Sequence, residues 1–250
     1  RQRTLFNYNA MGRAKEIIVK VIPSKIANEF VKKHHYSGKV VNNSILHFGC
    51  FLDDKLHGVM SFGSSMVKNN IVQLVENTRW NDFIELNRMA FDDYLPKYSE
   101  SRCLSIAFKL IKKNAPNIKW CISFSDGCQS GDGTIYRASG FKLIGIKENK
   151  SNLLLPSGEI VNTLNFTDGK SSWCKKIRRL GYTSKTKYLN ENQKGWKYLD
   201  GFQLRYIYLI DKTCKITVPV LPFSKIDEMG AGMYKGEKVT LAERKQARKV

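Results

Sequence analysis

Two side chains lie in sequence contexts that could support acid–base chemistry. Tyr136 sits in the stretch GTIYRASGF, between two glycines and before an aromatic residue that opens an apolar strand. Asp126 ends an apolar strand and precedes the glycine-rich loop DGCQSGDG. A positioned phenol can donate a proton, and a carboxylate can accept one. The alternatives are a tyrosine packed with its hydroxyl satisfied and an aspartate that caps the turn SDG.

Arg88 lies in a segment that reads as a strand. FIELNRMAF (83–91) alternates, which places Glu85 and Asn87 on one face and Arg88 among apolar residues on the other. A guanidinium on a mostly apolar face is costly unless it is paired. Arg88 therefore binds an anion or a group donor, or it forms a structural ion pair with Asp126 or Glu85.

Two adjacent histidines, His34 and His35, open the polar loop HHYSGKVVNNS. An imidazole, together with aspartate and tyrosine, could bind iron or another metal. The spacing is not a recognised metal signature, so an ordinary loop histidine is the alternative.

The charge of the chain points to a polyanionic partner. The 250 residues carry 42 Lys and Arg against 22 Asp and Glu, a net charge of +20. Cations that neutralise phosphates release counterions, which favours binding to nucleic acid. A soluble protein with a merely basic surface is the alternative.

The basic excess is densest between Lys170 and Gly201, where cations alternate with aromatic residues. Cations can hold phosphates while aromatic rings stack on bases or sugars. The competing interpretation is a solvated helix whose aromatic residues face the core, because Trp173, Ile177 and Leu180 have helical spacing. We expect phosphate contacts from Lys175, Lys176, Arg178, Arg179, Lys185 and Lys187.

The spacing of the cysteines and the distribution of apolar residues narrow the class of protein. The six cysteines are scattered without a CxxC pair, which favours small core residues and a reducing, intracellular compartment. There is no apolar run long enough to span a membrane, and the first residues lack the apolar centre of a signal peptide. The chain does not begin with Met, so Met11 could be a native start after upstream residues.

The periodicity predicts alternating strands and helices. We expect a strand at 16–22, a helix capped by Ser24, and a hairpin that turns at Asp53–Lys55. A second helix, capped by Ser99 or Ser101, should bury a stripe at Cys103, Leu104, Ala107, Phe108 and Ile111. Further strands are expected at 83–91, 119–126 and 141–147, a hairpin at 152–166, and a final strand pair at 201–211 and 215–223. This order implies an α/β protein with a mixed sheet packed by a few helices.

The segments HHYSG, ELNRMAF, SESRCLS, SFSD and GTIYRASGF together resemble the Mom family of phage DNA-modification proteins, a branch of the GNAT-like acyltransferases. The resemblance covers residues 17–167, and the segment LPFSKIDEMGAGMYKGEK is similar to a Mom-type tail. It implies a GNAT-like catalytic domain over residues 11–167, an α/β fold with a mixed, mostly antiparallel twisted sheet flanked by helices. Residues 168–250 would then form a basic extension that contains a β-hairpin and contacts DNA.

The resemblance implies conversion of adenine N6 in DNA to a carbamoylmethyl derivative, which shields phage DNA from restriction in the cytoplasm of the infected bacterium. The partners would be double-stranded DNA and a small-molecule group donor, with no membrane. The corresponding site residues would be Asp126, Tyr136, His35, Arg88 and Ser101, with His34 and Ser99 as close alternatives. In these roles Asp126 would take the N6 proton and Tyr136 would donate to the leaving group.

The group donor stays open. The glycine-rich pyrophosphate loop of ordinary GNAT enzymes is replaced by LPKYSESRC, which puts acetyl-coenzyme A in doubt and leaves another donor, or iron at His35, as alternatives. Two other functions remain: an N-acyltransferase that acts on tRNA or protein, and a non-catalytic nucleic-acid-binding module.

Overall fold

The computed structural model describes residues 12–65 and 68–247, which fall into two compact units. Unit 1 comprises the chain up to Ser125 together with Gly133–Gly145 and Leu204–Lys225. Unit 2 comprises Asp126–Asp132, Ile146–Gln203 and the chain from Ile226 onward. The expected single boundary after residue 167 does not follow this division, because the chain returns to unit 1 at residue 204. The expected start at Met11 lies outside the described residues.

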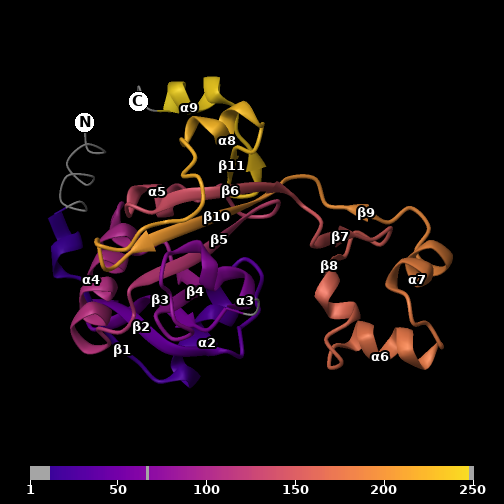
Figure 1. Cartoon of the computed structure of the whole chain (residues 1–250), viewed down its shortest axis with the longest axis horizontal. Helices are drawn as coiled ribbons and strands as arrows, with labels where there is room; N and C mark the ends of the chain where they lie inside the picture. The colour runs from indigo at the N-terminus through magenta and orange to yellow at the C-terminus, as the bar shows by residue number, and fades with distance from the viewer. Residues whose placement is uncertain (1–11, 66–67, 248–250) are drawn as a thin grey trace. The chain divides into compact units, whose positions relative to one another are not determined.

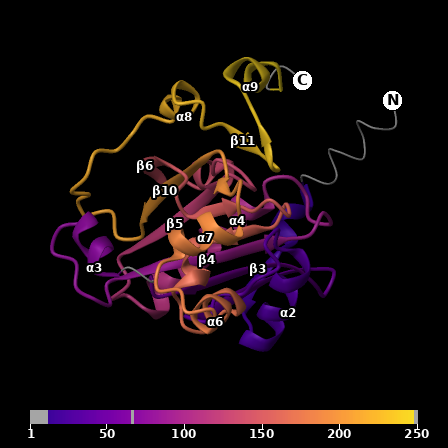
Figure 2. The ribbon, with the colours of Figure 1, turned by 90° about the vertical axis from the view of Figure 1, so that its right-hand side faces the viewer.

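A seven-stranded sheet forms the framework of unit 1, and its order is β1-β2-β3-β4-β5-β10-β6 (Figures 1 and 2). The pairs β1–β2, β2–β3 and β3–β4 are antiparallel, whereas β4–β5 is parallel. This confirms the expected α/β class with a mixed, mostly antiparallel sheet. The strands are β1 Ile18–Val21, β2 Ser44–Leu52, β3 Lys55–Gly63, β4 Phe83–Phe91, β5 Trp120–Gly127, β6 Lys142–Glu148 and β10 Phe202–Leu209.

Helices cover both faces of this sheet. Ala27 and Val31 of α2 pack with Val59 and Ala90, while Phe108 of α4 meets Phe62 edge to face. Val59 and Phe62 point to opposite faces of β3 because their separation along the strand is odd. The helical elements of unit 1 are η1 Arg13–Glu16, α2 Ser24–His34, α3 Lys68–Ile71, η2 Val72–Leu74, α4 Ser99–Asn114 and α5 Thr134–Ala138.

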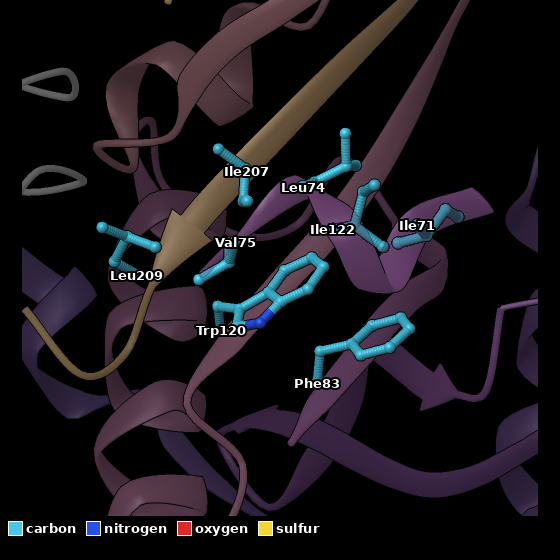
Figure 3. Close-up of a cluster of buried hydrophobic side chains, with 8 residues drawn as sticks. All are labelled: Ile71, Leu74, Val75, Phe83, Trp120, Ile122, Ile207 and Leu209. Carbon is cyan, nitrogen blue, oxygen red and sulfur yellow. The ribbon is translucent and has the colours of Figure 1, made fainter. Parts of the chain in front are cut away.

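A buried apolar cluster fixes the start of β4 against β5 and β10 (Figure 3). The rings of Phe83 and Trp120 stack at 4.5 Å, and the indole nitrogen of Trp120 donates to the hydroxyl of Thr78 at 3.1 Å. The run IVQLV, which the sequence alone did not assign, supplies Ile71, Leu74 and Val75 to this cluster. The cluster therefore packs the first residues of the parallel strands β4 and β5 against each other, and these strands carry candidate site residues.

Unit 2 has a smaller core of its own around a three-stranded sheet with the order β8-β7-β9. The expected hairpin is present as β7 Asn152–Leu154 and β8 Ile160–Asn162, with β9 Lys197–Tyr198 on the other edge of β7. The remaining elements are η3 Thr163–Phe166, α6 Ser172–Arg179, α7 Lys185–Asn192, the β11–β12 hairpin (Met233–Tyr234 and Glu237–Lys238) and α9 Leu241–Ala247. Helix α8 (Ser224–Glu228) begins in unit 1 and ends in unit 2.

Two local predictions were wrong. The segments 201–211 and 215–223 do not form a strand pair. Instead β10 enters the large sheet between β5 and β6, and the second segment makes only isolated bridges at Ile216 and Leu221. None of the three serines expected to cap a helix does so: Pro23 and Tyr98 occupy the two N-cap positions.

Candidate active site

A β-bulge in β4 brings Glu85 and Arg88 to the same face of the sheet. Arg88 lies opposite Ser61 on β3, Glu85 lies opposite Gly63, and Leu86 lies opposite Phe62, so Asn87 is the extra residue. Ser61 and Gly63 share a face of β3, so their partners share it too. The simple alternation expected from the sequence placed Glu85 and Arg88 on opposite faces, and the bulge makes that expectation wrong.

The ending of GTIYRASGF is a Schellman motif that fixes Tyr136. The amide of Phe141 donates to the carbonyl of Tyr136 at 3.0 Å, and the amide of Gly140 donates to the carbonyl of Arg137 at 3.2 Å. The rings of Tyr136 and Phe141 pack at 5.2 Å, which is the apolar contact typical of this cap. The pattern of tyrosine followed by glycine and phenylalanine therefore has a structural cause that also orients the phenol.

Substituting Gly140 by alanine should loosen this cap. Gly140 has φ +81°, a conformation that costs a residue with a Cβ about 1–2 kcal/mol. We expect the free energy of unfolding to fall by about that amount, measured by chemical denaturation. Gly145→Ala is the matched control, because a Cβ there meets its nearest atom at an ordinary 3.7 Å. Equal stability of the two variants would contradict the assigned cap.

Tyr136, Glu85 and Arg88 form one electrostatic cluster in unit 1. Burial raises the pKa of Tyr136 to about 12, against the effect of the neighbouring Ser123 hydroxyl, which lowers it. Burial also raises the pKa of Glu85, against the influence of Ser65, Asn87 and the Arg88 charge. The cluster thus holds a phenol that keeps its proton beside a carboxylate that is unusually basic, which are the properties of a general acid and a general base.

Arg88 is held at one end by the backbone. Its Nε donates to the carbonyl of Lys39 at 2.9 Å and its Nη1 donates to the carbonyl of Asn87 at 2.8 Å. Burial lowers the pKa of Arg88, while Tyr36, Glu85 and Tyr136 favour its charged form. A guanidinium has five N–H donors, so Arg88 has further N–H groups that can bind a ligand. Within the described part of the chain, Glu85 acts on Arg88 through its charge and not through a close salt bridge.

His35 lies in the loop that covers Arg88, next to Tyr36. Its Nδ1 is 2.8 Å from the hydroxyl of Ser37, and its ring packs on Tyr36 at 4.4 Å. Within residues 12–65 and 68–247, no three His, Cys, Asp or Glu side chains gather in a way that could hold a metal. Iron at His35 stays a prediction, because tyrosine, which was considered as one of its ligands, is not among these four residue types.

Asp126 lies in unit 2 at the end of β5, with its carboxylate surrounded by donors. Oδ1 accepts from the amide of Cys128 at 3.1 Å and from Nε2 of Gln203 at 2.9 Å. Oδ2 accepts from Gln129 at 2.8 Å and from Asn152 at 3.2 Å. These four donors occupy the lone-pair positions of the carboxylate within the protein, so none is left to accept from N6–H of a base. We therefore assign the general base elsewhere.

The serines of the α4 start are engaged with the backbone. The Ser101 hydroxyl donates to the carbonyl of Tyr98 at 3.1 Å, and that of the fully buried Ser99 donates to Pro96 at 2.5 Å. Tyr98 has φ +69°, an unusual value for a residue other than glycine. The first turn of α4 therefore begins without a side-chain cap. A substrate contact of Ser101 stays a prediction.

The aromatic residues of the basic segment belong to the core of unit 2. Tyr188 is buried, and Trp173, Tyr182 and Trp196 pack against the cluster that contains it. The polar atoms of Trp173, Tyr182 and Trp196 bond to Glu159, Glu191 and Asn190, respectively. The packing alternative is therefore correct for these rings. The cations Lys175, Lys176, Arg178, Arg179 and Lys187 are exposed, and Lys185 is half-buried.

The sequence did not single out several members of the cluster. Glu85 entered only as an ion-pair partner of Arg88, and Tyr36 and Ser123 were not considered. An acidic residue in a strand between Ile84 and Leu86, both buried, was the available signal for Glu85.

These features define an α/β protein that carries a half-buried acid–base cluster on the bulged strand β4 and the short helix α5, together with a second unit that has its own core. The chain belongs to the Mom protein family, whose sequence model matches residues 16–225. Over 136 residues it is 38% identical to the methylcarbamoylase Mom of Escherichia phage Mu. That alignment covers 54% of this chain and 56% of the phage Mu protein.

Similar solved structures include acetyltransferases of low sequence identity. An IAA acetyltransferase from Bacillus cereus aligns with a TM-score of 0.42 at 11% identity, covering 77% of this chain and 99% of that one. The ribosomal-protein-S18-alanine N-acetyltransferase of Escherichia coli aligns with a TM-score of 0.41 at 8% identity, covering 78% and 94%. Separately, no helix in the described part of the chain has both the length and the apolar character needed to cross a bilayer.

Proposed function

We propose that the chain is a Mom-type transferase that converts N6 of adenine in DNA to its carbamoylmethyl derivative. The observation that carries this proposal is the pairing of a basic carboxylate, Glu85, with a protonated phenol, Tyr136, around Arg88 in a member of the Mom family. The methylcarbamoylase of phage Mu supports the identity of the transferred group. The net charge of +20 supports DNA as the partner.

The substrate atom is a poor nucleophile, because its lone pair is delocalised into the purine ring. It is also paired in the duplex, so the base must leave the helix before it reacts. Glu85 would accept a proton from N6 as the new N–C bond forms. Tyr136 would give its proton to the leaving group as the bond between that group and the carbamoylmethyl carbon breaks.

Arg88 would hold the group donor through the N–H groups that the backbone does not use. The uncapped first turn of α4 would offer backbone amides to an anionic part of that donor. Acetyl-coenzyme A by itself does not supply this group, because acetyl transfer brings no amide nitrogen. The donor is therefore defined only as a molecule with a carbamoylmethyl group on a leaving group and an anionic handle.

The biological setting follows from the same proposal. A protein that modifies adenine while a phage replicates would work on double-stranded DNA in the cytoplasm of the infected bacterium. The added group would project into the major groove, where N6 of adenine is read. It would therefore block restriction enzymes that recognise adenine.

Plasmid DNA from bacteria that express the protein tests this function. We expect resistance to restriction enzymes whose sites contain adenine and normal cleavage by an enzyme that recognises only G·C pairs. The plasmid from cells that express a Tyr136→Phe variant serves as the control. Full cleavage by every enzyme, with soluble wild-type protein present, would oppose the proposal.

A further inference from the structure

Three packed aromatic rings join three separate segments of unit 1. Phe108 lies on α4, Phe141 directly precedes β6, and Tyr208 lies on β10. The rings of Phe108 and Tyr208 stack at 4.2 Å, and the ring of Phe141 is 5.8 Å from the first and 5.3 Å from the second. Phe108 and Phe141 are buried, whereas Tyr208 is half-buried. This packing fixes the three segments against one another.

Each of the three segments carries an exposed lysine beside its ring. Lys112 lies one helical turn after the α4 ring and therefore on the same side of that helix. Lys142 is the first residue of β6 and directly follows the second ring. The Nζ atom of Lys212 lies 4.2 Å from the centre of the Tyr208 ring. We call these three exposed side chains the lysine surface of unit 1.

The charges of the lysine surface repel one another. Burial lowers the pKa of Lys212, and the charges of Lys142 and Lys112 lower it further. Asp211 lies near Lys112, but its Oδ1 already accepts from the amide and the hydroxyl of Thr213, at 3.0 Å and 2.8 Å. Within residues 12–65 and 68–247, none of the three lysines forms a salt bridge. A bound anion would relieve this repulsion.

Packing on a ring explains only one of the three lysines. An ammonium group is attracted to the face of an aromatic ring, which accounts for the position of Lys212 without any partner. No such ring contact holds Lys112 or Lys142 in the part of the chain that the structure describes. A partner with several closely spaced negative charges suits the whole surface, and duplex DNA carries one charge for about every 1.7 Å of its axis.

The lysine surface is also linked to the catalytic phenol. The ring of Phe141 packs on Tyr208 at 5.3 Å and on Tyr136 at 5.2 Å, so one ring separates the two tyrosines within unit 1. We propose that the lysine surface binds the phosphate backbone of double-stranded DNA, on the unit that carries the acid–base cluster. This contact is additional to the basic segment of unit 2. It rests on the proposed function, which makes DNA the substrate.

Binding of a double-stranded oligonucleotide to the purified full chain at increasing salt tests the inference. Lys112→Gln/Lys142→Gln removes two charges and leaves the ring contact of Lys212 in place. We expect the slope of log affinity against log salt to fall by up to about 2, since each phosphate contact contributes about 0.9. Adding Lys212→Gln should lower the slope by about one further contact.

A matched variant on α2 controls for net charge. Lys25→Gln/Lys33→Gln also removes two exposed lysines, from a helix that covers the opposite face of the sheet from α4. Its slope should equal that of the wild type. If the Lys112/Lys142 variant fails to fold, as judged by thermal melting, Lys142→Gln alone carries the test, with an expected fall of about 0.9.

The failures can be told apart. A wild-type slope in the folded Lys112→Gln/Lys142→Gln variant would overturn the inference and leave the proposed function intact. An equal fall in the two double variants would also overturn it, because DNA would then respond to total charge. If the wild type neither binds the oligonucleotide nor modifies adenine in cells, the proposed function itself fails, and the inference fails with it.

Discussion

Replacing Glu85 by glutamine is expected to slow adenine modification by about 10²–10⁴-fold, the contribution typical of a general base. The variant keeps the size and polarity of the side chain but cannot accept the N6 proton. The rate can be followed as the fraction of modified adenine in cellular DNA after induction, at matched amounts of soluble protein. Glu29→Gln removes the same charge from an exposed position on α2 and should modify DNA at the wild-type rate.

The stability of this variant distinguishes lost chemistry from lost fold. Because burial raises the pKa of Glu85, the folded protein binds that proton more tightly than the unfolded chain does. The associated stability is present below the ordinary glutamate pKa of about 4.3 and is lost as the pH rises through the folded pKa. Glu85→Gln escapes this loss, so its melting temperature should gain on the wild type as the pH rises from about 4 to 7. A variant that melts far below the wild type at neutral pH would show that the fold needs the charge.

Removing three cations from α6 is expected to weaken DNA binding strongly. Lys175, Arg178 and Arg179 are exposed on a helix whose other face buries Cys174 and Ile177. Substituting all three by glutamine should lower the slope of log affinity against log salt by up to about 3, since each phosphate contact contributes about 0.9. Lys176 is left in place because its Nζ lies 5.0 Å from the ring of Trp173 and helps to cover the core of unit 2.

A matched variant on unit 1 controls for net charge. Lys25, Lys32 and Lys33 of α2 are also exposed, and their substitution by glutamine removes three charges as well. Its salt slope should stay close to that of the wild type. Equal slopes for the two triple variants would mean that DNA responds to total charge and not to the α6 surface.

The sequence predicted the secondary structure correctly where a pattern among neighbouring residues determines it. The stripe from Cys103 to Ile111 is buried as its helical spacing predicts. The two aspartates at 53 and 54 both adopt positive φ, as a tight hairpin turn requires. The two glycines that flank Tyr136 in the sequence bound the short helix α5, because Gly133 and Gly140 both adopt positive φ at its ends. These features depend on residues that are neighbours in the chain.

The remaining features depend on contacts between distant segments. Nothing within β4 indicates that Asn87 is an extra residue, because the bulge exists only in the register with β3. The strand β10 takes its place between β5 and β6 after an excursion of more than fifty residues through unit 2, which no local pattern encodes. The turn cap considered for Asp126 is present, since the amide of Cys128 donates to it, but its donor Gln203 is 77 residues away and no local pattern indicates that contact.

The most direct test of the central claim is mass spectrometry of the nucleosides from DNA of bacteria that express the wild-type protein. The account predicts a deoxyadenosine that is heavier by one carbamoylmethyl group, with fragmentation that places the group on N6, and its loss in cells that express Glu85→Gln. Unmodified deoxyadenosine in the presence of soluble, folded wild-type protein, or a modification on another base, would contradict it.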